Sequence, residues 1–412
     1  MTNKRIVVTG IGASSPLGGT APDSWDALLA GASGSRTLEY DWVEQYQLPV
    51  TFAAQAKVRP DTVLERPVAK RLDPSSQFAL VAAMEAWADA GAPEVEPERL
   101  GVDFATGIGG LWTLLDAWDT LREKGPRRVL PMTVPMLMPN AAAGNLSLHF
   151  GARAYARTVA SACASSTESL VNAVEHLRAG LADVVIAGGT ESVIHPITIS
   201  SFASMQALSR RNDSPATASR PGSIDRDGFV MGEGAGVLIL ESEEHAKARG
   251  AKIYAEVVGG GVTADSYHIT ANDPEGTGAA RAVNLALEAA GRGADEVTHV
   301  NAHATSTPVG DPNEYVALKS VFGDRIDEIP VSATKASTGH LLGGTGALEA
   351  IFTVLALRER LAPPTINITE QDPAVPFRLS GAPTALGAGD QLAISNSFGF
   401  GGHNAVVAFA SV

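Results

Sequence analysis

Short apolar runs alternate with amphipathic segments along the first 250 residues or so. Apolar runs at residues 5–9, 102–108 and 181–188 predict strands. The last of these is almost continuously apolar, which is typical of a strand buried on both faces of a parallel sheet. Residues 77–90 place apolar side chains at helical spacing and are followed by Gly91, so they predict an amphipathic helix. Buried strands that alternate with helices predict an α/β fold with helices on both faces of the sheet.

The pattern restarts near residue 255. The strands expected in this second half span residues 253–258, 297–301, 329–334, 392–394 and 404–409, and the helices span 278–290, 313–322 and 346–358. In each half a strand meets a turn of small residues and then a long helix, over 158–180 and over 331–358. The order of elements therefore suggests two related halves, residues 1–254 and 255–412, although their sequences barely match.

The chain has one cysteine, Cys163, in the small-residue turn of the first half. Residues 154–160 predict a strand before it, and apolar spacing predicts a helix from the turn to about Gly180. Free N–H groups at a helix N-terminus carry positive partial charge, which favours the nucleophilic thiolate. A lone cysteine in an apolar stretch is more often a buried small hydrophobe. Residues further along the chain must therefore decide between these two readings.

Composition and charge narrow the classes of function. The 412 residues are 45% hydrophobic and 18% charged, so a large core is expected, and one cysteine excludes a disulfide framework or a cysteine-rich metal site. The net charge of −14 argues against nucleic-acid binding. Residues 129–152 contain no Asp, Glu, Lys or Arg, but prolines and asparagines interrupt them, which argues against a membrane span. The glycines after residue 9 do not match the dinucleotide motif and no signal peptide is visible, so we expect no cofactor and a cytoplasmic protein.

Three predicted strand ends in the second half carry polar residues in apolar surroundings. They are the stretches that contain Asn301 and His303, Lys335 and His340, and Asn396 and Phe400. Sites in α/β sheets are built where strands end. Two histidines, a lysine, a cysteine and a glycine-rich phenylalanine loop at such ends predict a single chemical site.

These stretches resemble the condensing β-ketoacyl synthases of type II fatty acid synthesis, in particular the elongating β-ketoacyl-[acyl-carrier-protein] synthase II group. The resemblance covers essentially the whole chain, and its motifs are the turn at Cys163, His303 with Thr305 and Thr307, Lys335 with Gly339 and His340, and the loop from Asn396 to Gly402. It implies the thiolase fold, with duplicated halves in a five-layered α-β-α-β-α core. It also implies a homodimer that acts on acyl and malonyl thioesters of acyl carrier protein.

The resemblance implies a role for each catalytic residue. Cys163 attacks the acyl thioester and carries the chain, while the backbone N–H groups of Cys163 and Phe400 hold the oxyanion. His303 and His340 donate N–H bonds to the malonyl thioester oxygen as CO₂ leaves. Lys335 supports the two histidines, with Glu349 as its counter-charge; a plain buried ion pair is the alternative.

Further sites follow from the same resemblance. Thr305 and Thr307 would hold the phosphopantetheine arm, and Phe400 would act as a gate between the two half-reactions. The acyl pocket and its surroundings would include Ile108, Phe202, Leu342 and Phe398, and residues 134–138 would reach the partner subunit's pocket. A monovalent cation would lie among Asn301, Ala302, Glu349, Ser395 and Asn396.

Basic side chains cluster at a few places in this acidic chain. They are Arg66, Lys70, Arg71, Arg127, Arg128 and Arg210. We expect them to form a docking face for the acidic carrier protein, with solvated surface charge as the alternative reading.

Two residues depart from the family pattern, and some alternatives stay open. Ala304 stands where a glycine is usual in the family and adds a methyl group beside the site. His403 stands where many relatives carry threonine, and it resembles the histidine-containing loops of the mycolic-acid branch. A polyketide or mycolic-acid-type ketosynthase therefore remains an alternative. A non-catalytic scaffold or chain-length partner would tolerate loss of Cys163, and a thiolase would need a second cysteine.

Overall fold

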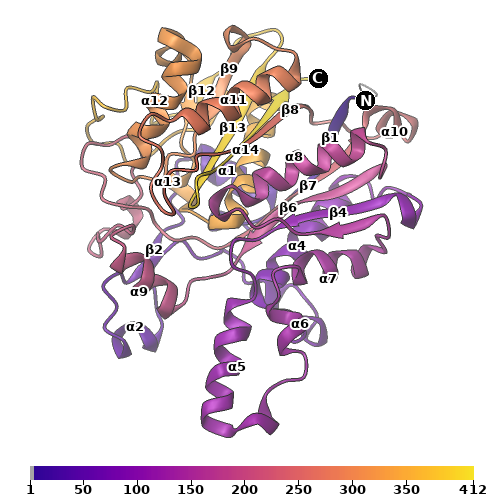
Figure 1. Cartoon of the computed structure of the whole chain (residues 1–412), viewed down its shortest axis with the longest axis vertical. Coiled ribbons are helices and arrows are strands. Elements are labelled where there is room, and N and C mark those ends of the chain that lie inside the picture. Colours follow the sequence, from indigo (N-terminus) through magenta and orange to yellow (C-terminus); the bar gives the residue numbers. More distant parts are fainter. Residues whose placement is uncertain (1–3) are drawn as a thin grey trace.

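The computed structural model describes residues 4–412 and contains one large mixed sheet of ten strands (Figure 1). In sheet order the strands are β10 (Val331–Ser332), β9 (Val297–Asn301), β13 (Leu392–Gly399), β14 (His403–Ala410), β8 (Ala255–Ala264), β1 (Ile6–Ser14), β7 (Gly234–Ser242), β6 (Val184–Glu191), β4 (Leu100–Ala105) and β5 (Tyr155–Arg157). Two small sheets pair β2 (Arg36–Thr37) with β3 (Phe52–Ala53) and β11 (Leu361–Ala362) with β12 (Thr384–Ala385).

The strand order repeats on either side of the β1–β8 pair. Outward from β1 the order is β7, β6, β4 and β5, and outward from β8 it is β14, β13, β9 and β10. In both directions the inner pairs are antiparallel and the two outermost pairs are parallel. The same five-strand pattern is thus built twice.

The expected parallel sheet is only partly correct. The apolar run near residue 185 forms β6, which pairs in parallel with β4 on one side and antiparallel with β7 on the other. All eight residues of β6 are buried. Burial on both faces determines the apolar pattern, and it does so whichever way the neighbouring strand runs.

Two long helices lie between the halves of the sheet. These are α8 (Ser165–Arg178) and α14 (Thr345–Glu359), and both contact strands of both halves. Almost every residue of α14 is buried, as expected for a helix that is apolar on all sides. Outside them, α4 (Pro74–Asp89) and α7 (Ala141–Phe150) cover the first half, whereas α11 (Thr277–Ala290) and α12 (Gly310–Phe322) lie on the second (Figure 1).

Not every helix of the structure was predicted. The clearest case is α5 (Leu111–Lys124), which has no buried residue and projects from the body of the molecule together with α6 (Thr133–Leu137) (Figure 1). The other short helices are α1 (Ala21–Leu29), α2 (Asp41–Gln45), α3 (Arg66–Ala69), α9 (Pro196–Ser204), α10 (Glu243–Ala248) and α13 (Lys335–Thr338). Within residues 4–412, no helix has both the length and the apolar character needed to cross a membrane.

Candidate active site

Each half builds the same strained turn before its central helix. In the first half the 3-10 turn Ala162–Ala164 leads into α8, and Ala162 has a φ of 51°. In the second half the turn Leu342–Gly344 leads into α14, and Leu342 has a φ of 46°. A positive φ is costly for residues with a side chain and is often found at functional sites. Cys163 is the residue that the first of these turns presents.

The N-terminal ends of α8 and α14 meet the end of β13. Thr167 and Ser397 share a hydrogen bond of 2.8 Å between their hydroxyl oxygens, and the Ala347 N–H donates to Ser166 at 2.9 Å. Gly399 passes so close to the cysteine turn that a Cβ there would lie 2.9 Å from the Cys163 nitrogen. Elements of both halves therefore converge on the turn that carries Cys163.

A cavity of about 590 Å³ opens beside this turn. It is lined by Cys163, His303, His340 and Phe400, and by every predicted substrate-binding residue, namely Thr305, Thr307, Ile108, Phe202, Leu342 and Phe398. The sequence analysis missed other lining residues, among them Gln206, Phe229, Thr270, Asn272 and Asn313. All of them except Asn313, which lies in α12, are outside the predicted helices and strands, and no sequence signal marked any of the five as a lining residue.

The Cys163 thiol is held in an environment that opposes ionisation. Burial raises the pKa of Cys163 to about 11, although the positive charge of Lys335 and hydrogen bonds from the backbone N–H groups of Phe400 and Cys163 lower it. The backbone N–H groups of the turn thus favour the thiolate, as expected, but loss of hydration opposes them more strongly in the unliganded cavity.

The two histidines lie edge to face in the cavity wall. Their ring centroids are 5.5 Å apart, at an interplanar angle of 84°. Burial, followed by the charge of Lys335, lowers the pKa of His303 and of His340 well below the ordinary value, so both rings are neutral near pH 7. Neutral rings in this position can donate N–H bonds to a substrate oxygen without carrying a charge of their own.

A hydroxyl group orients the ring of His340. The Nδ1 atom of His340 lies 2.9 Å from Oγ1 of Thr345, and its buried Nε2 has no partner within residues 4–412. A hydroxyl that donates to Nδ1 leaves the proton on Nε2. That nitrogen is then a donor available to a ligand.

Lys335 and Glu349 form the ion pair expected from the sequence. The Lys335 Nζ atom lies 2.7 and 2.9 Å from the two carboxylate oxygens, and both side chains are 1% exposed. Lys335 is not a lining residue of the cavity, but its charge lowers the pKa of Cys163, His303 and His340. It therefore acts on the site through its electric field.

The predicted cation residues are buried behind the histidines. They are Asn301, Ala302, Glu349, Ser395 and Asn396. The side-chain oxygens of Asn301 and Asn396 are buried without a hydrogen-bond partner within residues 4–412. Glu314 lies in the same region, where it accepts from the side-chain amide of Asn396 at 3.0 Å. Oxygen donors of this kind suit a hard cation.

The six predicted docking residues are all exposed and lie on three segments. Arg66, Lys70 and Arg71 lie in or just after α3, Arg127 and Arg128 in the turn after α5, and Arg210 after α9. None of the six forms a salt bridge within residues 4–412, and none lines the cavity.

The two departures from the family pattern do not enter the cavity. Ala304 is buried in an apolar core cluster, and its N–H donates to Glu314 at 2.7 Å. Ala304 therefore packs against the core between two lining residues, and the effect expected beside the site stays a prediction. The exposed His403 lies at the start of β14 with its ring against Gly401.

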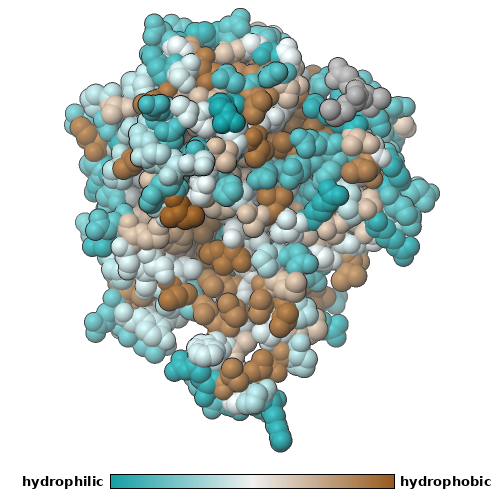
Figure 2. Space-filling model, viewed as in Figure 1, coloured by the Kyte–Doolittle hydropathy of each residue, from teal (hydrophilic) through white to brown (hydrophobic). Residues whose placement is uncertain are grey.

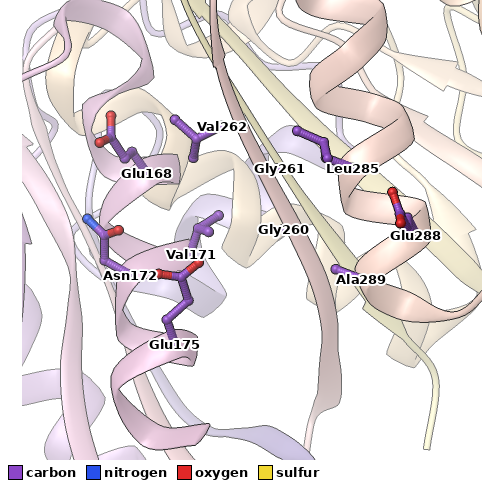
Figure 3. Close-up of a pocket in the computed structure, with 10 residues that line it drawn as sticks. All are labelled: Glu168, Val171, Asn172, Glu175, Gly260, Gly261, Val262, Leu285, Glu288 and Ala289. Carbon is purple, nitrogen blue, oxygen red and sulfur yellow. The ribbon is translucent and has the colours of Figure 1, made fainter. Parts of the chain in front are cut away.

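A second hollow of about 580 Å³ lies between α8, β8 and α11 (Figure 3). Glu168 and Glu175 come from α8 and Glu288 from α11, with β8 glycines between them. Its lining shares no residue with the Cys163 cavity and contains no basic side chain. Cys163, His303 and His340 therefore line the first of these two cavities and not the second.

Comparisons with known proteins match the chain over its full length. The family model described as "Beta-ketoacyl synthase, N-terminal domain" matches residues 3–246, and "Beta-ketoacyl synthase, C-terminal domain" matches residues 254–369. The chain is 44% identical to "3-oxoacyl-[acyl-carrier-protein] synthase 2" of Synechocystis sp. and of Staphylococcus aureus, over 99% of this chain and 98% of each relative.

Solved structures give the same result. A β-ketoacyl synthase from Burkholderia phymatum is similar with a TM-score of 0.90 and 36% identity, over 99% of this chain and 100% of the other. A ketosynthase described in a type II polyketide acyl-carrier-protein complex, AntDE:AntF, has a TM-score of 0.91 and 32% identity, over 99% of both chains.

Proposed function

The chain belongs to the beta-ketoacyl synthase family, and we propose that it carries out its condensing reaction with Cys163, His303 and His340. Its activity is that of a 3-oxoacyl-[acyl-carrier-protein] synthase, an acyltransferase of fatty acid synthesis. The observation that carries the assignment of residues is that the one cysteine and two neutral histidines line a single cavity. A polyketide ketosynthase is the second candidate, but the identity to the AntDE:AntF ketosynthase is 32%, against 44% to the synthase 2 relatives.

In the first half-reaction the acyl group moves to Cys163. The sulfur attacks the thioester carbonyl, the carbon–sulfur bond to the carrier breaks, and the thiol proton leaves with the carrier thiolate. The backbone N–H groups of Phe400 and Cys163, which hydrogen-bond to the sulfur in the unliganded site, are the donors for the oxyanion. One such donor is worth about 3–4 kcal/mol.

In the second half-reaction a malonyl thioester loses CO₂ and its carbon attacks the acyl-Cys163. Negative charge develops on the malonyl thioester oxygen, where His303 and His340 donate their N–H groups. The new carbon–carbon bond forms as the bond to Cys163 breaks, and the cysteine thiolate recovers a proton. Burial, together with the charge of Lys335, lowers the pKa of both histidines and keeps their rings neutral for this step.

The remaining cavity residues handle the substrate. Thr305 and Thr307, whose hydroxyl oxygens are 3.2 Å apart, would bind the pantetheine arm. Phe400 is 36% exposed and lies with its ring centroid 6.4 Å from that of Phe202, a position that suits a gate at the pocket. Ile108, Leu342 and Phe398 line the cavity and would contact the bound acyl chain.

The function is tested by intact-mass measurement after incubation with acyl carriers of graded length. The unchanged protein should gain one acyl group, and Cys163→Ala should gain none. His303→Ala and His340→Ala should still be acylated but should lose malonyl decarboxylation. Acylation of Cys163→Ala, or loss of both steps in a histidine variant, would contradict these roles.

We propose that the basic residues bind the carrier protein through its acidic surface. Their exposure and their freedom from salt bridges within residues 4–412 support this role. Arg127→Glu with Arg128→Glu should raise the KM for acyl carrier and leave the KM for a pantetheine thioester unchanged. Equal effects on both substrates would exclude docking at these two arginines.

We propose a monovalent cation at the site of Asn301, Ala302, Glu349, Ser395 and Asn396. Two unpartnered amide oxygens support it, as do two buried carboxylates, Glu314 and Glu349, which face a single buried lysine. The melting temperature should be higher in potassium or sodium salts than in a choline salt of equal ionic strength. Asn396→Ala should remove the difference, and a wild-type protein insensitive to these ions would contradict the site.

We also propose the thiolase fold for this chain, with halves 1–254 and 255–412 in a five-layered core. The repeated strand order and the central position of α8 and α14 support this division. The expected cytoplasmic location stays a prediction.

A homodimer is proposed on the apolar surface of the projecting helices. Figure 2 shows hydrophobic side chains gathered in the lower part of the molecule, where Figure 1 places α5 and α6. The exposed apolar residues of this region are Leu114, Trp118, Leu121, Leu130, Met132, Val134 and Met138. Patches of this kind mark protein interfaces, and residues 134–138 would then reach the partner subunit's pocket.

A further inference from the structure

Glu191 is a buried carboxylate close to the site that the catalytic steps do not use. It ends β6, is 0% exposed and forms no salt bridge within residues 4–412. Its oxygens instead accept four hydrogen bonds from neutral donors. These come from the Thr106 hydroxyl at 3.0 Å, and from the N–H groups of Gly107 at 2.8 Å, Ile108 at 3.2 Å and Gly343 at 3.1 Å.

The four donors belong to two turns that are far apart in the chain. Thr106, Gly107 and Ile108 follow β4, whereas Gly343 lies in the strained turn before α14. The turns touch: a Cβ on Gly343 would lie 2.2 Å from the Gly107 nitrogen, and one on Gly107 would lie 2.6 Å from a Glu191 oxygen. Only glycines allow both backbones to approach the carboxylate this closely.

Each turn also supplies a wall of the cavity. Ile108 follows Gly107, and Leu342 precedes Gly343, and both side chains line the space beside Cys163. The relative position of these two apolar side chains therefore depends on one carboxylate that binds both backbones.

We propose that Glu191 is a positioning residue that sets the acyl-chain length accepted by Cys163, by holding Ile108 and Leu342 at their present separation. The proposal rests on the proposed function. A short acyl group on the sulfur ends before these side chains, whereas a long one must pass along them. A hydrophobic pocket discriminates by about tenfold or more when its fit to a chain changes by a methylene. Loss of the carboxylate should therefore affect long chains selectively.

The test compares Glu191→Gln with Glu85→Gln. Glu85 is a matched control because it is also a largely buried carboxylate that accepts two backbone N–H bonds, from Ala13 and Ala21, and burial raises the pKa of both Glu85 and Glu191 to about 7. Its partners lie outside the cavity lining. Rates of Cys163 acylation are measured by intact mass with carriers bearing 4- to 16-carbon chains.

We expect Glu191→Gln to lower the ratio of long-chain to short-chain acylation by about tenfold. The charge of Glu191 also raises the pKa of Cys163, but its removal should act equally at all chain lengths and leave this ratio unaffected. Malonyl decarboxylation should be retained, and Glu85→Gln should leave the long-to-short ratio unchanged. An equal change at all lengths, or an unchanged ratio, would overturn the proposal. Should Glu191→Gln fail to fold, Glu191→Asp makes the same comparison, because its shorter side chain cannot reach both turns. A wild-type protein that no carrier acylates would instead contradict the proposed function.

Discussion

At the scale of single residues, burial governs the chemistry of the site. Cys163 is a thiol in the unliganded cavity because burial raises its pKa to about 11, and the two histidines are neutral because burial and Lys335 lower theirs. In the proposed reaction, the sulfur of Cys163 would then lose its proton as it attacks the thioester. Neutral imidazoles can then meet developing negative charge as hydrogen-bond donors.

Alkylation of Cys163 by iodoacetamide should become faster throughout the range from pH 7 to pH 9. Below the pKa of a thiol, the reactive thiolate fraction rises about tenfold for each pH unit. Because Cys163 is the only cysteine, the mass gain reports this residue alone. A rate that levels off below about pH 8.5, the usual thiol pKa, would show that the thiol ionises more easily than its burial indicates.

The sequence predicted that Cys163, His303 and His340 lie together, which the cavity lining confirms, but it did not predict their electrostatics. Cys163, His303 and His340 stand in motifs, and Glu349 was correctly matched to Lys335. Desolvation depends on atoms brought in by the whole fold, so the sequence suggested a thiolate where burial favours the thiol. Glu191 was missed for a similar reason, since its donors become neighbours only in the folded chain.

At the scale of elements, the sequence predicted those with a clear core face. The strand expected at 297–301 is β9, and the helix expected at 278–290 is α11, which begins one residue earlier. Residues 154–160 gave only a three-residue strand, β5, at the edge of the sheet. The projecting α5 escaped prediction because it has no buried residue, although Leu111 at its start is partly buried against a core cluster.

Substitution of Gly346 by alanine should loosen the contact between α8 and α14. A Cβ there would lie 2.1 Å from the Thr167 hydroxyl oxygen, which bonds to Ser397. We expect a loss of about 1–3 kcal/mol in the free energy of unfolding, as for other overpacked sites, together with slower acylation of Cys163. Urea unfolding measures the first effect and intact mass the second.

Gly144→Ala is the matched control for this substitution. Gly144 also lies in a helix, α7, and has open space where a Cβ would be added. Alanine should therefore be neutral or stabilising there, by up to about 1 kcal/mol. If Gly346→Ala and Gly144→Ala had equal free energies of unfolding, the contact between α8 and α14 at Gly346 would not be tightly packed.

At the scale of the whole molecule, the sequence indicated two halves but not how they join. The sequence indicated the repeated order of strand, turn and helix, but it did not predict the antiparallel pairing of β1 with β8. That pairing joins residues about 250 positions apart, such as Ile6 with Val257, and no local pattern specifies it. Packing of α8 and α14 against both halves then makes the site a product of the entire chain.

The apolar surface of α5 leads to the prediction that the molecule works as a dimer. Trp118 is 55% exposed and Leu114 48%, on a helix that buries no residue against its own chain. Wild-type protein should therefore have twice the chain mass of 42.6 kDa in light scattering, and Leu114→Glu with Trp118→Glu should shift it toward the single-chain mass. Val316→Glu, at a 44% exposed position on α12, is the control and should remain dimeric. If the double variant keeps the wild-type mass, the apolar face of α5 is not the interface. If it becomes monomeric and loses acylation by long chains more than by short chains, residues 134–138 of the partner complete the pocket.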